Sequence, residues 1–522
     1  MIQTVEIFLA FIFFILACNY IYISNLKQEW GSDHYVHKLI IDLIKQNGNR
    51  FIKNVKPFLI GNMMGYPQLY HWILSYLTES QLKFIIRYQN ILMNLTILFL
   101  HCSFSFYLAS SLKTEANSFQ ILLYAPLLLL SSGILFDGQN ARNTGLSARS
   151  IGFIIGQIFT YCCYFYFRGD YYVIFSFPLL MLLSLLASQF TTQFIIIASV
   201  ILSLLFMDYL FILSNISGIL LFALFFPSTS KIYMVYQWKH KKYYAKYGTK
   251  IVLLAQRMSI WCDFIHIARF LKEKGIPGSL SYMYNNPIVK VLTGVPCVMF
   301  VLYIILRQFH YDKYFIDSNL VVLMKIIVAS FVVFIITSFK YTRFLGEPER
   351  YVEFTVSIAC AVAAIQFVDQ PLLVILIVIL GLPRLIVECH LIPHLKTIFT
   401  NKGKMRNIGI DLSSLRKEIE KSRTNNKSIR ILSNNFEITK QLLDIKWEYF
   451  YGWLFFLSED FDPRILYKEN AIISEEYLAH FINKYNISHV IIDTRTFEGN
   501  IQEKIRYQKK VWTDGRLELY LV

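Results

Sequence analysis

Long apolar windows recur along most of this 522-residue chain. A window of about 17–25 apolar residues is long enough to cross the hydrocarbon core of a bilayer as a helix, whose backbone bonds are all internal. Hydrophobic residues make up 55% of the chain and charged residues only 16%, whereas a soluble domain carries about 25% charged residues. A transmembrane β-barrel would instead show alternating segments of about ten residues. The sequence therefore predicts a polytopic α-helical membrane protein.

The apolar windows predict about 11 spans, several of them short enough for a broken or re-entrant helix. The predicted spans are 4–24, 87–109, 119–136, 150–167, 171–187, 190–207, 210–227, 291–308, 319–338, 354–368 and 371–388. The first apolar run lacks the basic region of a signal peptide and is too long for its apolar core. We expect it to be a retained helix, with a lipoprotein cleavage site at Cys18 as the weaker alternative.

An odd number of spans places the two ends of the chain on opposite sides of the membrane. Lys113, Arg168, Arg307 and Lys313 fall in loops that are cytoplasmic if the N-terminus is cytoplasmic, which agrees with the positive-inside rule. The resulting division has a transmembrane helical domain at 1–394, with outer loops 25–86 and 228–290. A soluble domain at 395–522 then lies outside the cytoplasm.

The tail alternates strand and helix patterns. It reads as a strand at 428–433, a helix at 475–484, a buried strand at 488–493 and a hairpin at 510–521. The hairpin turn contains Asp514-Gly515, a typical two-residue turn signal. Alternating strands and helices predict a small C-terminal extracytoplasmic α/β domain.

The net charge of +16 is concentrated in the stretch 231–290, where lysines and arginines alternate with Tyr, Trp and His. This mixture suits a phosphate-rich membrane interface, although a solvated charged face explains it equally well. Nothing else in the chain resembles a nucleic-acid module, so a nucleic-acid partner is not expected. The 8 cysteines show no metal-type spacing, which predicts neither a disulfide framework nor a zinc site.

Four polar clusters face the same compartment in this topology. Ionisable groups at the edge of a bilayer are costly to desolvate and often mark a site, so their coincidence predicts an active site at that interface. The clusters are Asp33 with His34, His37 and His71; Asp137, Gln139, Asn140, Arg142, Asn143 and Arg149; the basic stretch 231–290; and the segment 343–353 with Glu347, Glu349 and Arg350.

A purely structural interpretation competes with each cluster. Asp33 occupies a typical helix N-cap position, and His37 fits the water line of an amphipathic interfacial helix. The aromatic residues around His71 are common in aromatic belts. Arg142 and Arg149 can reach lipid headgroups, and the acids of the fourth cluster can form local ion pairs of little energetic value.

These residues together resemble the GT-C superfamily. The resemblance rests on Asp33 in the first outer loop, the Tyr66-Pro67…His71 segment before the second span, the many spans and the outer α/β tail. The segment 346–351, Gly-Glu-Pro-Glu-Arg-Tyr, resembles a Gly-Glu-x-x-Arg-Tyr loop of bacterial members. The resemblance implies an integral-membrane glycosyltransferase of the bacterial inner membrane that uses a polyprenyl-phosphate-linked sugar. The tail has no WWDYG-type motif, so a glycan or lipid acceptor is expected rather than a protein asparagine.

The chemistry of glycosyl transfer suits these residue types. The reaction passes through an oxocarbenium-like transition state, a carboxylate takes the acceptor proton, and cations stabilise the leaving phosphate. Asp33 is the predicted base, or alternatively a ligand of a divalent cation such as Mg²⁺ or Mn²⁺. The donor phosphate is assigned to Arg142, Arg149 and Arg350, and substrate binding to His34, His37, His71, Glu347 and Glu349.

Two other functions stay open at this point. The chain fits a flippase or transporter of a lipid-linked oligosaccharide, in which the basic stretch binds the pyrophosphate. It also fits a surface-polysaccharide polymerase or ligase. Transporters usually place ionisable groups near the middle of the membrane. Here Lys325 is the main such group, which favours an enzyme at the interface.

Overall fold

The structure of this protein is a computed structural model. The chain forms two compact units. The helical unit comprises Met1–Gln28, Glu79–Phe226 and Arg257–Arg406, and the mixed unit comprises Glu29–Thr78, Pro227–Gln256 and Asn407–Val522. The residues that the structure describes are 32–111, 118–132, 145–247, 271–273, 275–276, 279–280, 283, 286–310, 318–388, 412–422, 428–451, 478–495 and 509–522.

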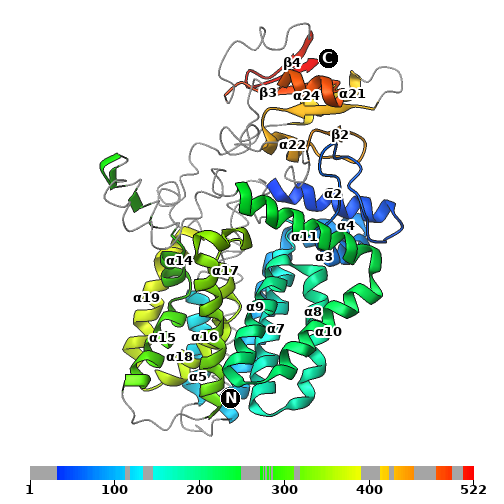
Figure 1. Ribbon diagram of the computed structural model, residues 1–522. Helices are drawn as coiled ribbons and strands as arrows, with labels where there is room; N and C mark the ends of the chain where they lie inside the picture. Colours follow the sequence, from blue (N-terminus) through cyan, green and yellow to red (C-terminus); the bar gives the residue numbers. More distant parts are fainter. Residues whose placement is uncertain are drawn as a thin grey trace. The chain divides into compact units, whose positions relative to one another are not determined.

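Helices occupy every predicted span range of the helical unit except 4–24, which lies outside the described residues (Figure 1). They are α4 (Glu79–Ser111), α5 (Ser118–Ser131), α7 (Arg149–Arg168), η1 (Tyr171–Phe175), α8 (Ser176–Ala187), α9 (Gln189–Phe206), α10 (Tyr209–Phe225), α14 (Pro287–Gly294), α15 (Pro296–His310), α16 (Ser318–Ser338), η2 (Lys340–Leu345), α17 (Glu349–Glu353), α18 (Val356–Gln366) and α19 (Pro371–Glu388). In Figure 1, α7, α8, α9 and α10 run side by side.

Within the described residues, 4 helices are long and apolar enough to cross a membrane: Leu92–Ser111, Arg149–Arg168, Gln189–Phe206 and Ser318–Ser338. The number rises to 6 if each of two bent helix pairs counts as one span. One of these pairs is α14 with α15, which are bent by 94°. The remaining apolar helices are shorter. The chain therefore has the helices of a polytopic membrane protein, while the larger number of spans stays a prediction.

Close helix packing in the helical unit depends on two glycines of α7. A Cβ atom added at Gly152 would lie 2.3 Å from Cβ of Ser188, and one added at Gly156 would lie 2.2 Å from the ring of Phe354. Small residues four apart let neighbouring elements approach the helix backbone. The Phe354 ring in turn stacks on Phe194 of α9, with centroids 4.6 Å apart. This packing holds the chain segment before α18 against α7 and α9.

Lys325, the main charge inside a predicted span, has a structural role. Its Nζ donates to the carbonyl oxygen of Leu205 at 3.1 Å and lies 4.4 Å from the ring centroid of Phe206. Leu205 and Phe206 end α9, where backbone carbonyls lack helical partners and a cation is favourable. The lysine therefore completes a helix terminus.

The mixed unit contains one five-stranded sheet in the order β2-β1-β3-β5-β4. β1 pairs with β2 and β3 in parallel, while β5 pairs with β3 and β4 antiparallel. Its elements are α2 (Ser32–Gln46), α3 (Leu69–Ser75), α11 (Pro227–Tyr247), α21 (Leu412–Lys421), β1 (Arg430–Ser433), α22 (Phe436–Leu442), β2 (Glu448–Tyr449), α24 (Leu478–Tyr485), β3 (His489–Asp493), β4 (Lys509–Thr513) and β5 (Leu517–Leu521). The predicted C-terminal α/β pattern is confirmed, and α21, α22 and β2 are additions to it.

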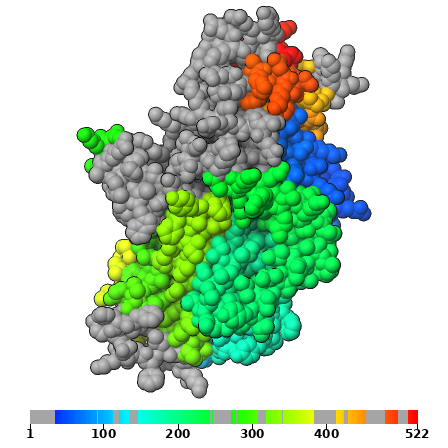
Figure 2. Space-filling model, viewed as in Figure 1, coloured from blue at the N-terminus to red at the C-terminus, as the bar shows by residue number. Residues whose placement is uncertain are grey.

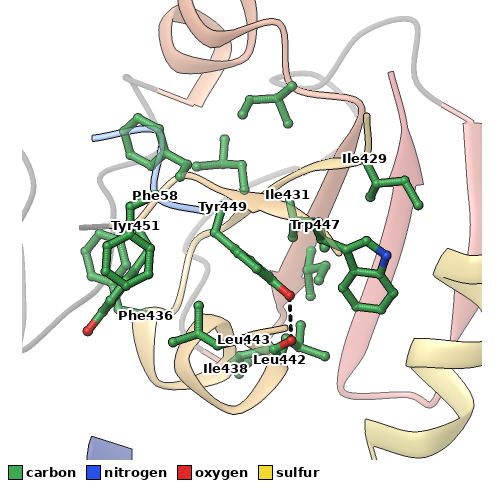
Figure 3. Packing of buried hydrophobic residues seen from close by; sticks show 14 of the residues in the cluster. Phe58, Ile429, Ile431, Phe436, Ile438, Leu442, Leu443, Trp447, Tyr449 and Tyr451 are labelled. Carbon is green, nitrogen blue, oxygen red and sulfur yellow. Dashed lines mark hydrogen bonds between the residues drawn. The ribbon is translucent and has the colours of Figure 1, made fainter. Parts of the chain in front are cut away.

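The core of the mixed unit combines residues from both ends of the sequence. Apolar side chains of α2 and of the segment that follows it, from Val36 to Met64, pack in one cluster with residues between Leu412 and Tyr520. Figure 3 shows Phe58 beside Tyr449, whose hydroxyl donates to the carbonyl of Leu442 at 2.6 Å. The segment 36–64 therefore belongs to the same folded unit as the C-terminal sheet.

Candidate functional site

Asp33 lies in the first turn of α2, because the helix begins at Ser32. This position agrees with the predicted start of a helix near His34. The side chain of Asp33 lies outside the described residues, so its contacts are not defined. Its predicted role as base or metal ligand therefore stays a prediction.

The structure brings His37 of α2 and His71 of α3 together. Nδ1 of His37 lies 2.8 Å from Nε2 of His71, and both side chains are buried. The rings are stacked with centroids 5.0 Å apart, and the Tyr70 ring lies edge-on 6.0 Å from His37. A hydrogen bond at this distance requires that one nitrogen carries a proton and the other does not. The pair is thus a buried polar contact, not the water-line histidine of an interfacial helix.

Burial governs the ionisation of the neighbouring imidazoles. Desolvation, followed by the nearby His37 and Lys38 charges, lowers the pKa of His34 to about 3. Desolvation and the proximity of His37 also lower the pKa of His71 well below its ordinary value. These two side chains are therefore neutral at physiological pH and can orient a polar group without adding positive charge.

A second set of polar residues forms what we call the ion-pair cluster in the helical unit. Arg149, at the start of α7, has Nη2 at 2.9 Å from Oε2 of Glu353. Lys290 of α14 has Nζ at 2.6 Å from Oε1 of Glu349. The third pair is Glu347 with Arg350, whose guanidinium also lies 4.6 Å from the ring centroid of Phe190. The cluster therefore consists of Arg149, Lys290, Glu347, Glu349, Arg350 and Glu353.

The segment that carries this cluster has a fixed backbone. Gly346 has a φ of +113°, and a Cβ atom there would lie 2.4 Å from the Phe190 ring, so only glycine fits without strain. Oη of the buried Tyr351 lies 2.7 Å from Oε1 of Gln193 and 2.7 Å from the carbonyl oxygen of Leu345. Ser330 Oγ donates to the Tyr351 carbonyl at 2.9 Å. Contacts with α9 and α16 therefore hold the acids of α17 in place.

The charges of the ion-pair cluster balance, because each of its three bases faces an acid. An anionic ligand at Arg149 or Arg350 must therefore compete with Glu353 or Glu347. Lys290 and Glu353 had no assigned role in the sequence interpretation. Lys290 is one of many lysines in the basic stretch, and Glu353 is the last acid of its segment. Only their ion pairs with Glu349 and Arg149 identify them as members of the cluster.

The predicted site residues fall into both units. Arg142 lies outside the described residues, whereas Arg149, Arg350, Glu347 and Glu349 share the ion-pair cluster. His34, His37 and His71 lie in the mixed unit. Among the described residues, no three His, Cys, Asp or Glu side chains form a group that could hold a metal ion.

The chain was also compared with known proteins. No model of a known protein family matches it, and no curated protein matches it either. The resemblance to the GT-C superfamily therefore stays a prediction from the chain's own residues.

Proposed function

We propose that this protein is an integral-membrane glycosyltransferase that moves a sugar from a polyprenyl-phosphate donor to a glycan or lipid acceptor. The observation that carries the proposal is the ion-pair cluster. Its three acids and Arg350 lie on a fixed backbone segment, and Arg149 of α7 and Lys290 of α14 pair with two of these acids. This segment packs against the long apolar helices α9 and α16. Cations suit a lipid-linked phosphate, carboxylates suit sugar hydroxyls, and the apolar helices suit the lipid tail.

The mixed unit is built from three separate segments of the chain, and this supports the proposed topology. A compact polar unit lies on one side of a bilayer, so the chain must cross an even number of times between residues 78 and 227, and again between 256 and 407. Among the described residues, the long helices number three in the first interval and one in the second, and the two bent helix pairs raise these numbers to four and two. The larger set of proposed spans also gives even numbers, six and four, with the shorter helices as the additional crossings. We place the mixed unit outside the cytoplasm, on the outer face of a bacterial inner membrane.

In the proposed reaction, the bond between the anomeric carbon and the phosphate oxygen breaks, and its electron pair leaves with the polyprenyl phosphate. The acceptor hydroxyl oxygen forms the new bond to that carbon, and its proton passes to the carboxylate of Asp33. Arg149 and Arg350 stabilise the departing phosphate, with Lys290 as a third cation of the same cluster. Glu347 and Glu349 bind sugar hydroxyls, and the neutral histidines orient the acceptor.

The test is a transfer assay with the purified full-length protein in detergent and a panel of labelled polyprenyl-phosphate sugars. Release of polyprenyl phosphate together with a glycosylated acceptor is expected. Asp33→Asn and Arg350→Gln should each reduce transfer by roughly 100-fold or more, while the exposed Arg87→Gln on α4 should leave it unchanged. Full activity of Asp33→Asn would remove Asp33 from the mechanism.

A proteoliposome assay separates this function from transport. The labelled donor is placed in one leaflet and its appearance in the other leaflet is followed. Movement of an intact donor without any sugar transfer would overturn the proposal and favour a flippase.

A further inference from the structure

The outward side of α11 is an amphipathic stripe. Its exposed residues include Lys231, Met234, Val235, Trp238 and Lys242, and these positions recur every three or four residues. Such spacing places them on one face of a helix. The central three are apolar, with 49%, 40% and 72% of their surface exposed, and a lysine stands at each end. Green side chains of this helix lie at the molecular surface in Figure 2.

The opposite side of α11 is anchored inside the mixed unit. Tyr233, Tyr236 and Gln237 are buried, and the Tyr236 ring stacks on His240 with centroids 5.9 Å apart. Gly65 lies so close that a Cβ atom there would be 1.9 Å from Tyr236 Cγ. The helix therefore cannot turn its exposed apolar residues inward without losing this packing.

The chain places the start of α11 at a membrane edge. α10 ends at Phe225 and α11 begins at Pro227, and the intervening Phe226 has a non-helical φ of −129° and ψ of 56°. α10 coincides with a predicted span and exposes Leu213, Leu220 and Leu224, as a lipid-facing helix does. The covalent link through this single residue leaves the start of α11 within a few ångströms of the point where that span ends.

Charge and shape then identify the surface that this stripe fits. An apolar strip with tryptophan at its centre and lysines around it suits the boundary between acyl chains and headgroups. Half-buried Lys239 and Lys241 lie on the two flanks of the strip, so their ammonium groups can reach anionic headgroups. A free phosphate would satisfy the lysines but would leave Met234, Val235 and Trp238 in water.

We propose that α11 binds the membrane surface through this stripe, with the three apolar side chains below the headgroups and the lysines paired with anionic phospholipids. The inference is independent of the glycosyl-transfer proposal. It attaches the mixed unit to the bilayer surface through α11.

The test places the photoreactive residue p-benzoylphenylalanine at position 238 of the full-length protein in nanodiscs of mixed phosphatidylglycerol and phosphatidylcholine. After irradiation, intact-mass spectrometry should show lipid adducts enriched in phosphatidylglycerol. The same residue at the exposed Lys446 position of the same unit serves as the control and should give at least fivefold fewer lipid adducts. An absence of lipid adducts at position 238 would overturn the proposal, as would cross-links to a second copy of the chain.

Charge variants test the anionic preference separately. Lys231→Glu with Lys242→Glu should lower the ratio of phosphatidylglycerol to phosphatidylcholine adducts by about fivefold or more, since each lysine near a membrane surface contributes roughly that factor. Lys231→Gln with Lys242→Gln provides a milder pair in case charge reversal disturbs folding. An unchanged ratio in the folded glutamine pair would refute the role of the lysines.

Discussion

Arg149 and Glu353 are joined across 204 residues of sequence. Nη2 of the arginine lies 3.0 Å from Oε1 and 2.9 Å from Oε2 of the carboxylate. The glutamate side chain is only 9% exposed and the arginine 24%. The pair fixes the start of α7 to the end of α17. In the proposed reaction, a phosphate that binds Arg149 must compete with Glu353 for the guanidinium.

Removing one partner of this ion pair should lower the free energy of unfolding more than removing both partners does. Arg149→Gln leaves the carboxylate of Glu353 desolvated without its cation, a loss of about 1–3 kcal/mol. The double variant Arg149→Gln with Glu353→Gln should recover part of this loss. Apparent thermal midpoints in detergent measure the difference, with the exposed Lys83→Gln as control. Additive effects of the two single substitutions would show that the pair is not energetically coupled.

Acid should destabilise the mixed unit through its buried histidines. In the unfolded chain an imidazole takes up a proton below about pH 6.5, whereas folded His34 resists it until about pH 3. Protons therefore favour the unfolded state in that window, by about 1.4 kcal/mol per pH unit for such a histidine. Above the window this contribution is constant.

His34→Gln should therefore flatten the dependence of stability on pH between about 6.5 and 4, relative to the unmodified protein. Amide hydrogen exchange of α2 at several pH values provides the measurement. His71→Gln should act in the same direction, because burial lowers the pKa of His71 as well. The interpretation fails if both variants keep the original slope.

A methyl group at Gly156 should disturb the packing beside the ion-pair cluster. Its Cβ would lie 2.2 Å from Cδ1 of Phe354, so the ring or the helix must move at a cost of about 1–3 kcal/mol. Gly156→Ala should lower both the thermal midpoint and any transfer activity. Adding Phe354→Leu should restore part of the midpoint. A Gly156→Ala protein as stable as the original would show that the ring moves freely.

A buried carboxylate stabilises the sheet of the mixed unit. Asp493, at the end of β3, is fully buried and accepts hydrogen bonds from Asn435 Nδ2 and Arg516 Nη2, each at 3.1 Å. Asp493→Ala leaves Arg516 without its anion and should lower the free energy of unfolding by about 3–5 kcal/mol. Faster hydrogen exchange in β3 and β5 would report it. Arg516→Leu combined with Asp493→Leu should be less damaging than Asp493→Ala, and the reverse order would count against this role.

The sequence predicted local structure better than long-range contact. Apolar windows located the helices of the helical unit, because the length of an apolar run reflects whether the helix is long enough to cross a bilayer. Alternation and the Asp514-Gly515 turn located β3, β4 and β5. The short β2 and α22 were missed, since two and seven residues carry too little periodicity to detect. The 10-residue α21 was missed as well, although its buried Leu412, Leu415 and Ile419 follow helical spacing.

The candidate site was predicted only as residue types in four clusters. The contact of His37 with His71 spans 34 residues, and that of Lys290 with Glu349 spans 59. No local pattern encodes such pairs, because they depend on how distant helices pack. Lys325 is a further example. The sequence identifies it as an unusual charge in a predicted span, but its hydrogen bond to Leu205 at the end of α9 is visible only in the structure.

The bridge between Phe58 and Tyr449 has a consequence for biosynthesis. The carbonyl of Tyr449 accepts a hydrogen bond from the Leu59 N–H, and the Tyr449 N–H donates one to the Pro57 carbonyl. The segment after α2 therefore adds to the edge of a sheet that is synthesised roughly 390 residues later. At about 5–20 residues per second, a ribosome needs roughly 20–80 seconds to supply that partner. During this interval the apolar side chains of α2 have no sheet to cover them. The core of this unit is therefore complete only when synthesis is nearly finished, and chains truncated before the sheet should be early targets of proteolysis.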